Sequence, residues 1–123
     1  MTLTVSPSDY ARDLFAALDA KNVPALAALM TDDVHLRLGN AEPVEGKPAF
    51  IAASEAFNAS VTAVRHHVLD VWSAGDALIV QLDVHYTRLD GQELTLPCCN
   101  VFRLRDGLVS DYRVYMDINP VYA

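Results

Sequence analysis

The stretch KPAFIAASEAFNASVTAVRHHVLDVW, residues 47–72, decides the fold because its hydrophobic period changes near Val61. The first half is rich in alanine, carries Pro48 near its start and repeats apolar residues at helical spacing, which predicts a helix over Lys47 to Ala59. From Val61 onward apolar and polar residues alternate, which is typical of a strand with one buried face. The sequence therefore passes from helix to sheet at this point.

Before this stretch, two helices and a strand are predicted. Ser8 precedes YARDLFAALDA, whose apolar residues recur at helical spacing, and Asn22 can cap a short helix over VPALAALM. The segment DDVHLRLGN alternates apolar and polar residues and ends at Gly39 and Asn40, as a half-buried strand does.

After Val61 four strands follow one another, separated by the turn-forming segments SAGD, LDGQ and RDG. Helices first and a series of strands afterwards predict an α+β fold with a mainly antiparallel sheet, and 123 residues suit one domain over 1–123. The predicted strands are Thr62–Trp72, Ala77–Arg88, Glu93–Arg105 and Leu108–Ile118.

Composition excludes several classes of partner. A net charge of -7 disfavours nucleic acid and anionic membrane surfaces, which attract basic patches. The N-terminus MTLTVSPSDYARDLF has no secretory pattern and no apolar run is long enough to span a bilayer, so a cytoplasmic protein is expected. The neighbouring Cys98 and Cys99 would point to opposite faces of a strand, so both are expected to be reduced. No metal-ligand spacing and no nucleotide-binding motif is present, so no metal and no cofactor is expected.

The segments ALMTDDVHLRL, VEGKPAFIAA and NVFRLRDGLVSDYRVYMD resemble the SnoaL-like branch of the NTF2-like superfamily, and the resemblance covers essentially the whole chain. It implies a cone, or cystatin-like α+β roll, in which three N-terminal helices pack on a curved sheet. It also implies a pocket between helices and sheet, and a homodimer through the outer sheet face.

Two groups of enzymes in this superfamily have known catalytic residues. Ketosteroid isomerases use a Tyr, an Asp base and an acidic oxyanion donor, and the resemblance places Leu14, Leu38 and Asn100 at those positions. Limonene-epoxide hydrolases use an Arg-x-Asp segment and a second Asp, which match Gln81-Leu82-Asp83 and Val114. Neither catalytic set is complete, and both named activities are disfavoured.

The resemblance also places the polar face of the strand IVQLDVHYT on the concave side, so that Gln81, Asp83 and His85 would face the pocket. Same-face neighbours lie about 7 Å apart, so Asp83 and His85 can share a proton or a substrate group. They are the predicted catalytic pair, and apolar surroundings are expected to raise the pKa of Asp83. The alternative is a polar, wet part of the sheet.

The remaining predictions concern ligand and partner. Gln81 and Asn100 are expected to orient polar groups of a small apolar or amphipathic ligand. Two functions stay open: an acid/base isomerase, cyclase or hydrolase, and a non-catalytic binding or dimerisation module like nuclear transport factor 2. The predicted apolar pocket wall comprises Leu14, Leu36, Leu38, Phe102, Val114 and Met116, and the predicted dimer patch comprises Val80, Leu82, Val84, Tyr86, Cys99 and Val101.

Overall fold

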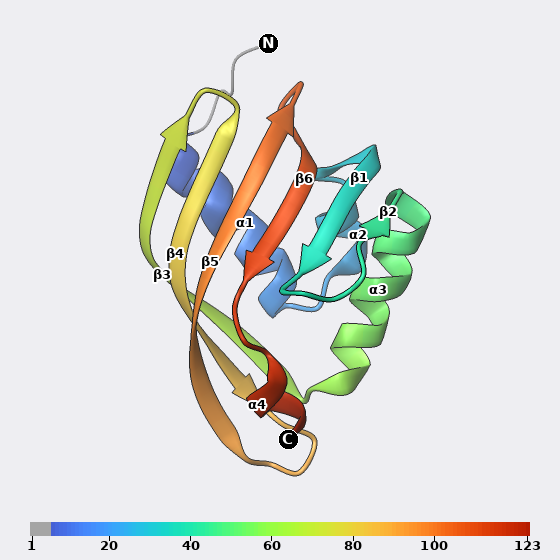
Figure 1. Ribbon diagram of the computed structural model, residues 1–123, viewed down its shortest axis with the longest axis vertical. Helices are drawn as coiled ribbons and strands as arrows, with labels where there is room; N and C mark the ends of the chain where they lie inside the picture. Colours follow the sequence, from blue (N-terminus) through green and yellow to red (C-terminus); the bar gives the residue numbers. More distant parts are fainter. Residues whose placement is uncertain (1–5) are drawn as a thin grey trace.

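The computed structural model describes residues 6–123 and, within them, combines one six-stranded sheet with four helices (Figure 1). The prediction of no secretory signal concerns in part residues 1–5, which lie outside the described residues. The elements are α1 (Pro7–Asp19), α2 (Val23–Ala27), β1 (Met30–Leu38), β2 (Val44–Glu45), α3 (Lys47–Ser60), β3 (Ala63–Ala74), β4 (Ala77–Thr87), β5 (Glu93–Arg105), β6 (Leu108–Tyr115) and α4 (Asn119–Tyr122).

The predicted order of helices and long strands is confirmed, with differences at the ends of elements. Helix α1 begins at Pro7, and its N-cap is Ser6 rather than Ser8, because the Ser6 hydroxyl accepts from the amide of Asp9 at 3.1 Å. Asn22 caps α2 as predicted, accepting from the amide of Ala25 at 3.2 Å. Neither β2 nor α4 is predicted from the sequence, because each is too short to show a hydrophobic period.

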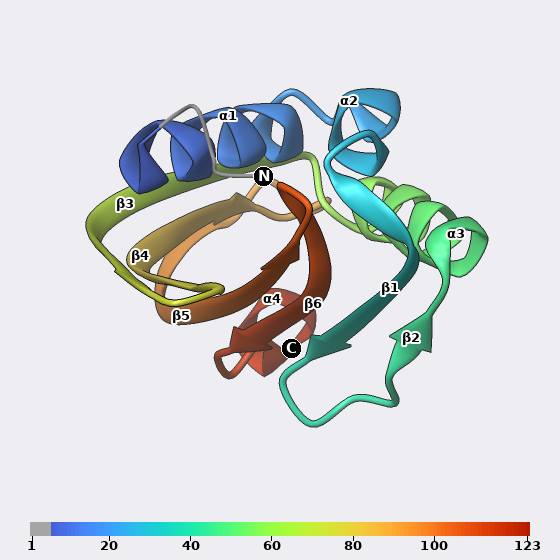
Figure 2. The same ribbon diagram turned by 90° about the horizontal axis from the view of Figure 1, so that it is seen from above.

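The sheet has the strand order β2-β1-β6-β5-β4-β3 and is antiparallel except where β1 and β6 run parallel. It curls strongly, and the helices cover its concave face: α1 lies over β3 and β4, and α3 lies beside β1 (Figure 2). The prediction of a curved, mainly antiparallel sheet is therefore confirmed. Two of the predicted turns hold Gly75 and Gly91 at φ of 60° and 86°, which a residue with a Cβ rarely adopts.

The core fills the space between the concave face and the helices. Leu14 of α1, Phe50 of α3 and Phe102 of β5 are all fully buried there. Tyr10, Ala11, Leu14 and Phe15 form the buried stripe of α1 that packs toward β3. This packing fixes the end of α1 against the sheet, where the cavity described below begins.

Helix α4 lies at the end of the molecule where α3 finishes (Figure 1). It is anchored by Arg88, whose guanidinium donates to the carbonyl of Pro120 at 3.1 Å and to that of Ala123 at 2.6 Å. Val121 is buried, and the Tyr122 hydroxyl is 2.8 Å from that of Ser60. The C-terminal segment is thereby fixed beside the last turn of α3. None of the helices within residues 6–123 has both the length and the apolar character needed to cross a bilayer.

Candidate functional site

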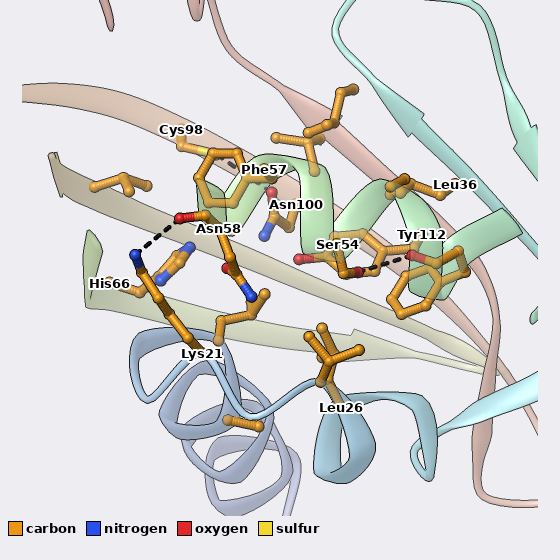
Figure 3. Close-up of a pocket in the computed structure, with 18 of the residues that line it drawn as sticks. Lys21, Leu26, Leu36, Ser54, Phe57, Asn58, His66, Cys98, Asn100 and Tyr112 are labelled. Carbon is orange, nitrogen blue, oxygen red and sulfur yellow. Dashed lines mark hydrogen bonds between the residues drawn. The ribbon is translucent and has the colours of Figure 1, made fainter. Parts of the chain in front are cut away.

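A cavity of about 90 Å³ lies between the concave face of the sheet and the meeting point of α1, α2 and α3 (Figure 3). Its wall is mainly apolar. An apolar cavity of about 150 Å³ can hold benzene. This cavity is smaller and suits a small ligand, and a larger ligand would require side chains at the rim to move. The polar side chains that reach the wall belong to Lys21, Asn22, Ser54, Asn58, His66, Tyr86, Cys98, Asn100 and Tyr112.

One residue of this wall, His66, is paired with Asp19, which lies outside the wall. His66 of β3 has its Nδ1 2.6 Å from the Asp19 carboxylate at the end of α1, and the same carboxylate accepts the His66 backbone amide at 3.1 Å. The Phe15 ring stacks on the imidazole with 4.8 Å between centroids. Because the carboxylate can only accept, the neutral imidazole carries its hydrogen on Nδ1 and leaves the lone pair on Nε2. Among residues 6–123 no hydrogen bond occupies Nε2 of His66, so this nitrogen can accept a proton.

Asn100 brings an amide into the cavity from the middle of β5. Its side chain is 2% exposed, and its Oδ1 accepts from the Cys98 thiol at 3.2 Å. Within residues 6–123 no hydrogen bond reaches its amide nitrogen, which points into the cavity in Figure 3. A buried amide with one end satisfied and the other facing a cavity is equipped to donate to a ligand.

Two tyrosines line the same cavity as this amide. Tyr112 of β6 packs against the ring of Phe102 with 4.6 Å between centroids, and burial raises the pKa of its hydroxyl above the usual 10.0. The Tyr86 hydroxyl donates to the sulfur of Met116 at 3.5 Å, and burial raises its pKa as well. Both hydroxyls therefore stay protonated at neutral pH and can only meet a ligand as neutral groups.

Lys21 closes one edge of the cavity. Its ammonium donates to the carbonyls of Asn58 and Val61, both at 2.9 Å, and so satisfies groups at the C-terminus of α3. The dashed line from Lys21 to Asn58 in Figure 3 marks one of these bonds. The positive charge of Lys21 is therefore engaged by the backbone. Two of its three N–H donors are thereby satisfied.

The predicted placement of Gln81, Asp83 and His85 is wrong, because all three lie on the outer face of β4. Residues opposite each other on paired strands share a face, and the alternate residues of β4 are buried against the helices, with Val84 and Tyr86 in the cavity wall. His85 contacts Glu93 and Thr95 on β5, each at 2.9 Å. The resemblance predicts that the polar face of β4 points inward. The orientation is decided instead by the burial of five apolar residues on the other face: Leu78, Val80, Leu82, Val84 and Tyr86.

The other predicted site residues divide into two groups. Asn100, Leu36, Leu38, Val114 and Met116 line the cavity, and Leu38, 39% exposed, lies at its rim. Leu14 and Phe102 are fully buried in the core and do not line it.

Sequence reasoning missed His66, Asp19 and Tyr112. A signal for two of them was present: His66 alternates in phase with Val64 and Val68, and Tyr112 in phase with Val114. No comparable signal marks Asp19, because its contact with His66 depends on how α1 packs across the sheet. Among residues 6–123, no cluster of His, Cys, Asp or Glu side chains could hold a metal ion.

The profile of the SnoaL-like domain matches residues 11–112, and no curated protein matches the sequence. An NTF2-like protein of unknown function from Burkholderia pseudomallei is 18% identical, with a TM-score of 0.86 over 97% of this chain and 100% of the other. A putative SnoaL-like polyketide cyclase from Jannaschia is 20% identical, with a TM-score of 0.82 over 98% of this chain and 95% of the other.

A third structure comes from Catenulispora acidiphila and is a hypothetical protein of ketosteroid isomerase-like fold in complex with trimethylamine. It is 16% identical, with a TM-score of 0.84 over 92% of this chain and 88% of the other. At these identities the likeness establishes the NTF2-like fold. Since the family profile covers most of the sequence, the chain belongs to the SnoaL-like domain family.

Proposed function

We propose that this protein binds a small, largely apolar carbonyl compound and that His66 moves a proton at the carbon next to the carbonyl. The observation that carries the proposal is His66 in the wall of an apolar cavity, with its imidazole 2.6 Å from the Asp19 carboxylate behind it. A base in an apolar site held by a carboxylate is a recurring arrangement for proton transfer. The complex of a similar protein with trimethylamine supports a small ligand.

The proposed step uses three groups of this chain. A C–H bond next to the carbonyl breaks, its proton passes to Nε2 of His66, and the electron pair forms an enolate. Asp19 stabilises the imidazolium, and the Asn100 amide donates to the enolate oxygen. In a β,γ-unsaturated ketone the electron pair extends into a dienolate, and transfer of the proton from His66 to its γ carbon gives isomerisation. In a compound with a second carbonyl, attack of the enolate carbon on that group gives cyclisation, and the new alkoxide takes the proton from His66.

Exchange of carbon-bound hydrogen in D2O tests this proposal without knowledge of the natural substrate. Cyclopentanone is small, neutral and carries exchangeable hydrogens beside its carbonyl. We expect the protein to accelerate their replacement by deuterium, followed by proton NMR, with a rate that saturates as the ketone concentration rises. Saturable binding without exchange would contradict proton transfer and favour a non-catalytic binding module. Absence of binding would contradict the pocket function itself.

We also propose a homodimer through the outer sheet face, although not through the whole predicted patch. Val80, Leu82, Val84 and Tyr86 are buried under the helices, so they cannot contribute. The outer face instead exposes Trp72 and Tyr115, 48% and 55% exposed, next to the partly buried apolar residues Ile79, Cys99 and Val101. Contiguous exposed apolar surface of this kind is uncommon in soluble monomers.

Light scattering at micromolar concentration is expected to give twice the 13.5 kDa of one chain. Trp72→Arg should shift the mass toward one chain, because a charge buried within the contact would lose its hydration. Leu89→Arg, at an exposed turn position away from this face, is the matched control and should leave the dimer intact. A wild-type mass of 13.5 kDa would contradict the proposal.

A further inference from the structure

The two ends of the Asn100 amide are not equivalent for a ligand. With the nitrogen toward the cavity, the side chain donates a hydrogen bond, and with the oxygen toward the cavity it accepts one. The neighbour that distinguishes the two orientations is Cys98, two residues earlier on the same face of β5, whose Sγ lies 3.2 Å from Oδ1. In Figure 3 this contact holds the oxygen to one side and leaves the nitrogen facing the cavity.

The thiol is suited to this task because it stays protonated. Burial raises the pKa of Cys98 from the usual 9.0 to about 12, so at neutral pH the side chain presents S–H rather than a thiolate. In the structure the S–H group, a weak donor, has the strong acceptor oxygen of the amide as its partner. The opposite orientation would pair the NH2 group with sulfur, a weak acceptor, and would take this acceptor away from the S–H group.

We propose that Cys98 is a positioning residue that turns the Asn100 amide so that the cavity selects neutral ligands carrying an acceptor oxygen. The inference rests on the proposed function in that the ligand occupies this cavity. It narrows the ligand class to ketones, aldehydes and similar neutral carbonyl compounds. Carboxylates are disfavoured where the Asn100 amide lies, because the mainly apolar wall would remove the hydration of a charged group.

A pair of isosteric probes measures the selection directly. Cyclopentanone and methylenecyclopentane differ only in C=O against C=CH2, and their dissociation constants can be obtained by NMR titration. We expect the wild type to bind the ketone about 2- to 10-fold more tightly, as one hydrogen bond provides. Cys98→Ser keeps a donor and should retain this ratio, whereas Cys98→Ala should bring it close to one. Thr95→Ala, at an exposed position on the opposite face of β5, is the control and should behave as wild type.

The amide orientation is measured separately, without any ligand. In wild type and Cys98→Ser, the Asn100 side-chain NH2 protons should show no strong NOE to the β protons of residue 98, because the oxygen faces that residue. In Cys98→Ala a second orientation with such an NOE should appear. An Ala variant that keeps both the wild-type ratio and the single orientation would overturn the inference. Failure of both probes to bind the wild type would contradict the proposed function, and the NOE result would still decide the role of Cys98.

Discussion

Replacing His66 with glutamine is expected to lower the rate of deuterium incorporation into cyclopentanone by about 10²- to 10⁴-fold, which is the usual contribution of a positioned general base. Glutamine is of similar size and polar, so the cavity wall and the contact with Asp19 can persist while the basic nitrogen is lost. The ketone should therefore still bind with a dissociation constant close to that of the wild type. The measurement is the initial exchange rate by proton NMR at saturating ketone.

His67 provides the matched control for this variant. It is the next residue on β3, is exposed, and points to the opposite face of the strand, where it lies opposite Asp83. His67→Gln should exchange at the wild-type rate. An equal loss of rate in both variants, or a His66→Gln protein with undiminished exchange, would remove His66 from the mechanism.

Phe102→Ala is expected to reduce the free energy of unfolding by about 3–5 kcal/mol, the usual loss for a fully buried phenylalanine. Phe102 is 0% exposed and contacts the rings of Tyr112 and Phe15, with centroids at 4.6 and 6.2 Å. It therefore joins α1 to the sheet. A loss of this size is a large part of the 5–15 kcal/mol that stabilises an ordinary domain.

Urea unfolding followed by circular dichroism gives this difference, with Leu89→Ala as the control. Leu89 is 69% exposed in the turn after β4, and its truncation should change stability by less than about 0.5 kcal/mol. Similar urea midpoints for Phe102→Ala and the wild type would mean that the contact between α1 and β5 contributes little to the stability of the core.

Much of the fold is predictable because it depends on local patterns. The change of period near Val61 separates helices from strands, and Lys47 to Ala59 is helical as predicted, with one further residue at its end. Gly75 and Gly91 mark two hairpin turns through their positive φ values. These features follow from the nearest residues in the chain and need no knowledge of tertiary contacts.

The candidate site was less predictable, because it depends on which face of each strand is concave. Alternation alone divides β4 into two faces but does not say which one meets the helices. The cross-strand register resolves this, since Asn100 lies opposite Val80 and therefore shares its face rather than that of Gln81 and Asp83. The Asp19–His66 contact joins residues 47 positions apart and arises only from the packing of α1 on the sheet.

The most direct test of the account is to map where cyclopentanone binds, using side-chain chemical shifts of isotopically labelled protein during a titration. If the ligand occupies the cavity, the resonances of His66, Asn100 and Tyr112 should shift together with one dissociation constant. Those of Asp83 and His85 on the outer face should not shift. Shifts confined to Asp83 and His85 would contradict the account, because the ligand would then occupy the outer face of the sheet instead of the cavity beneath the helices.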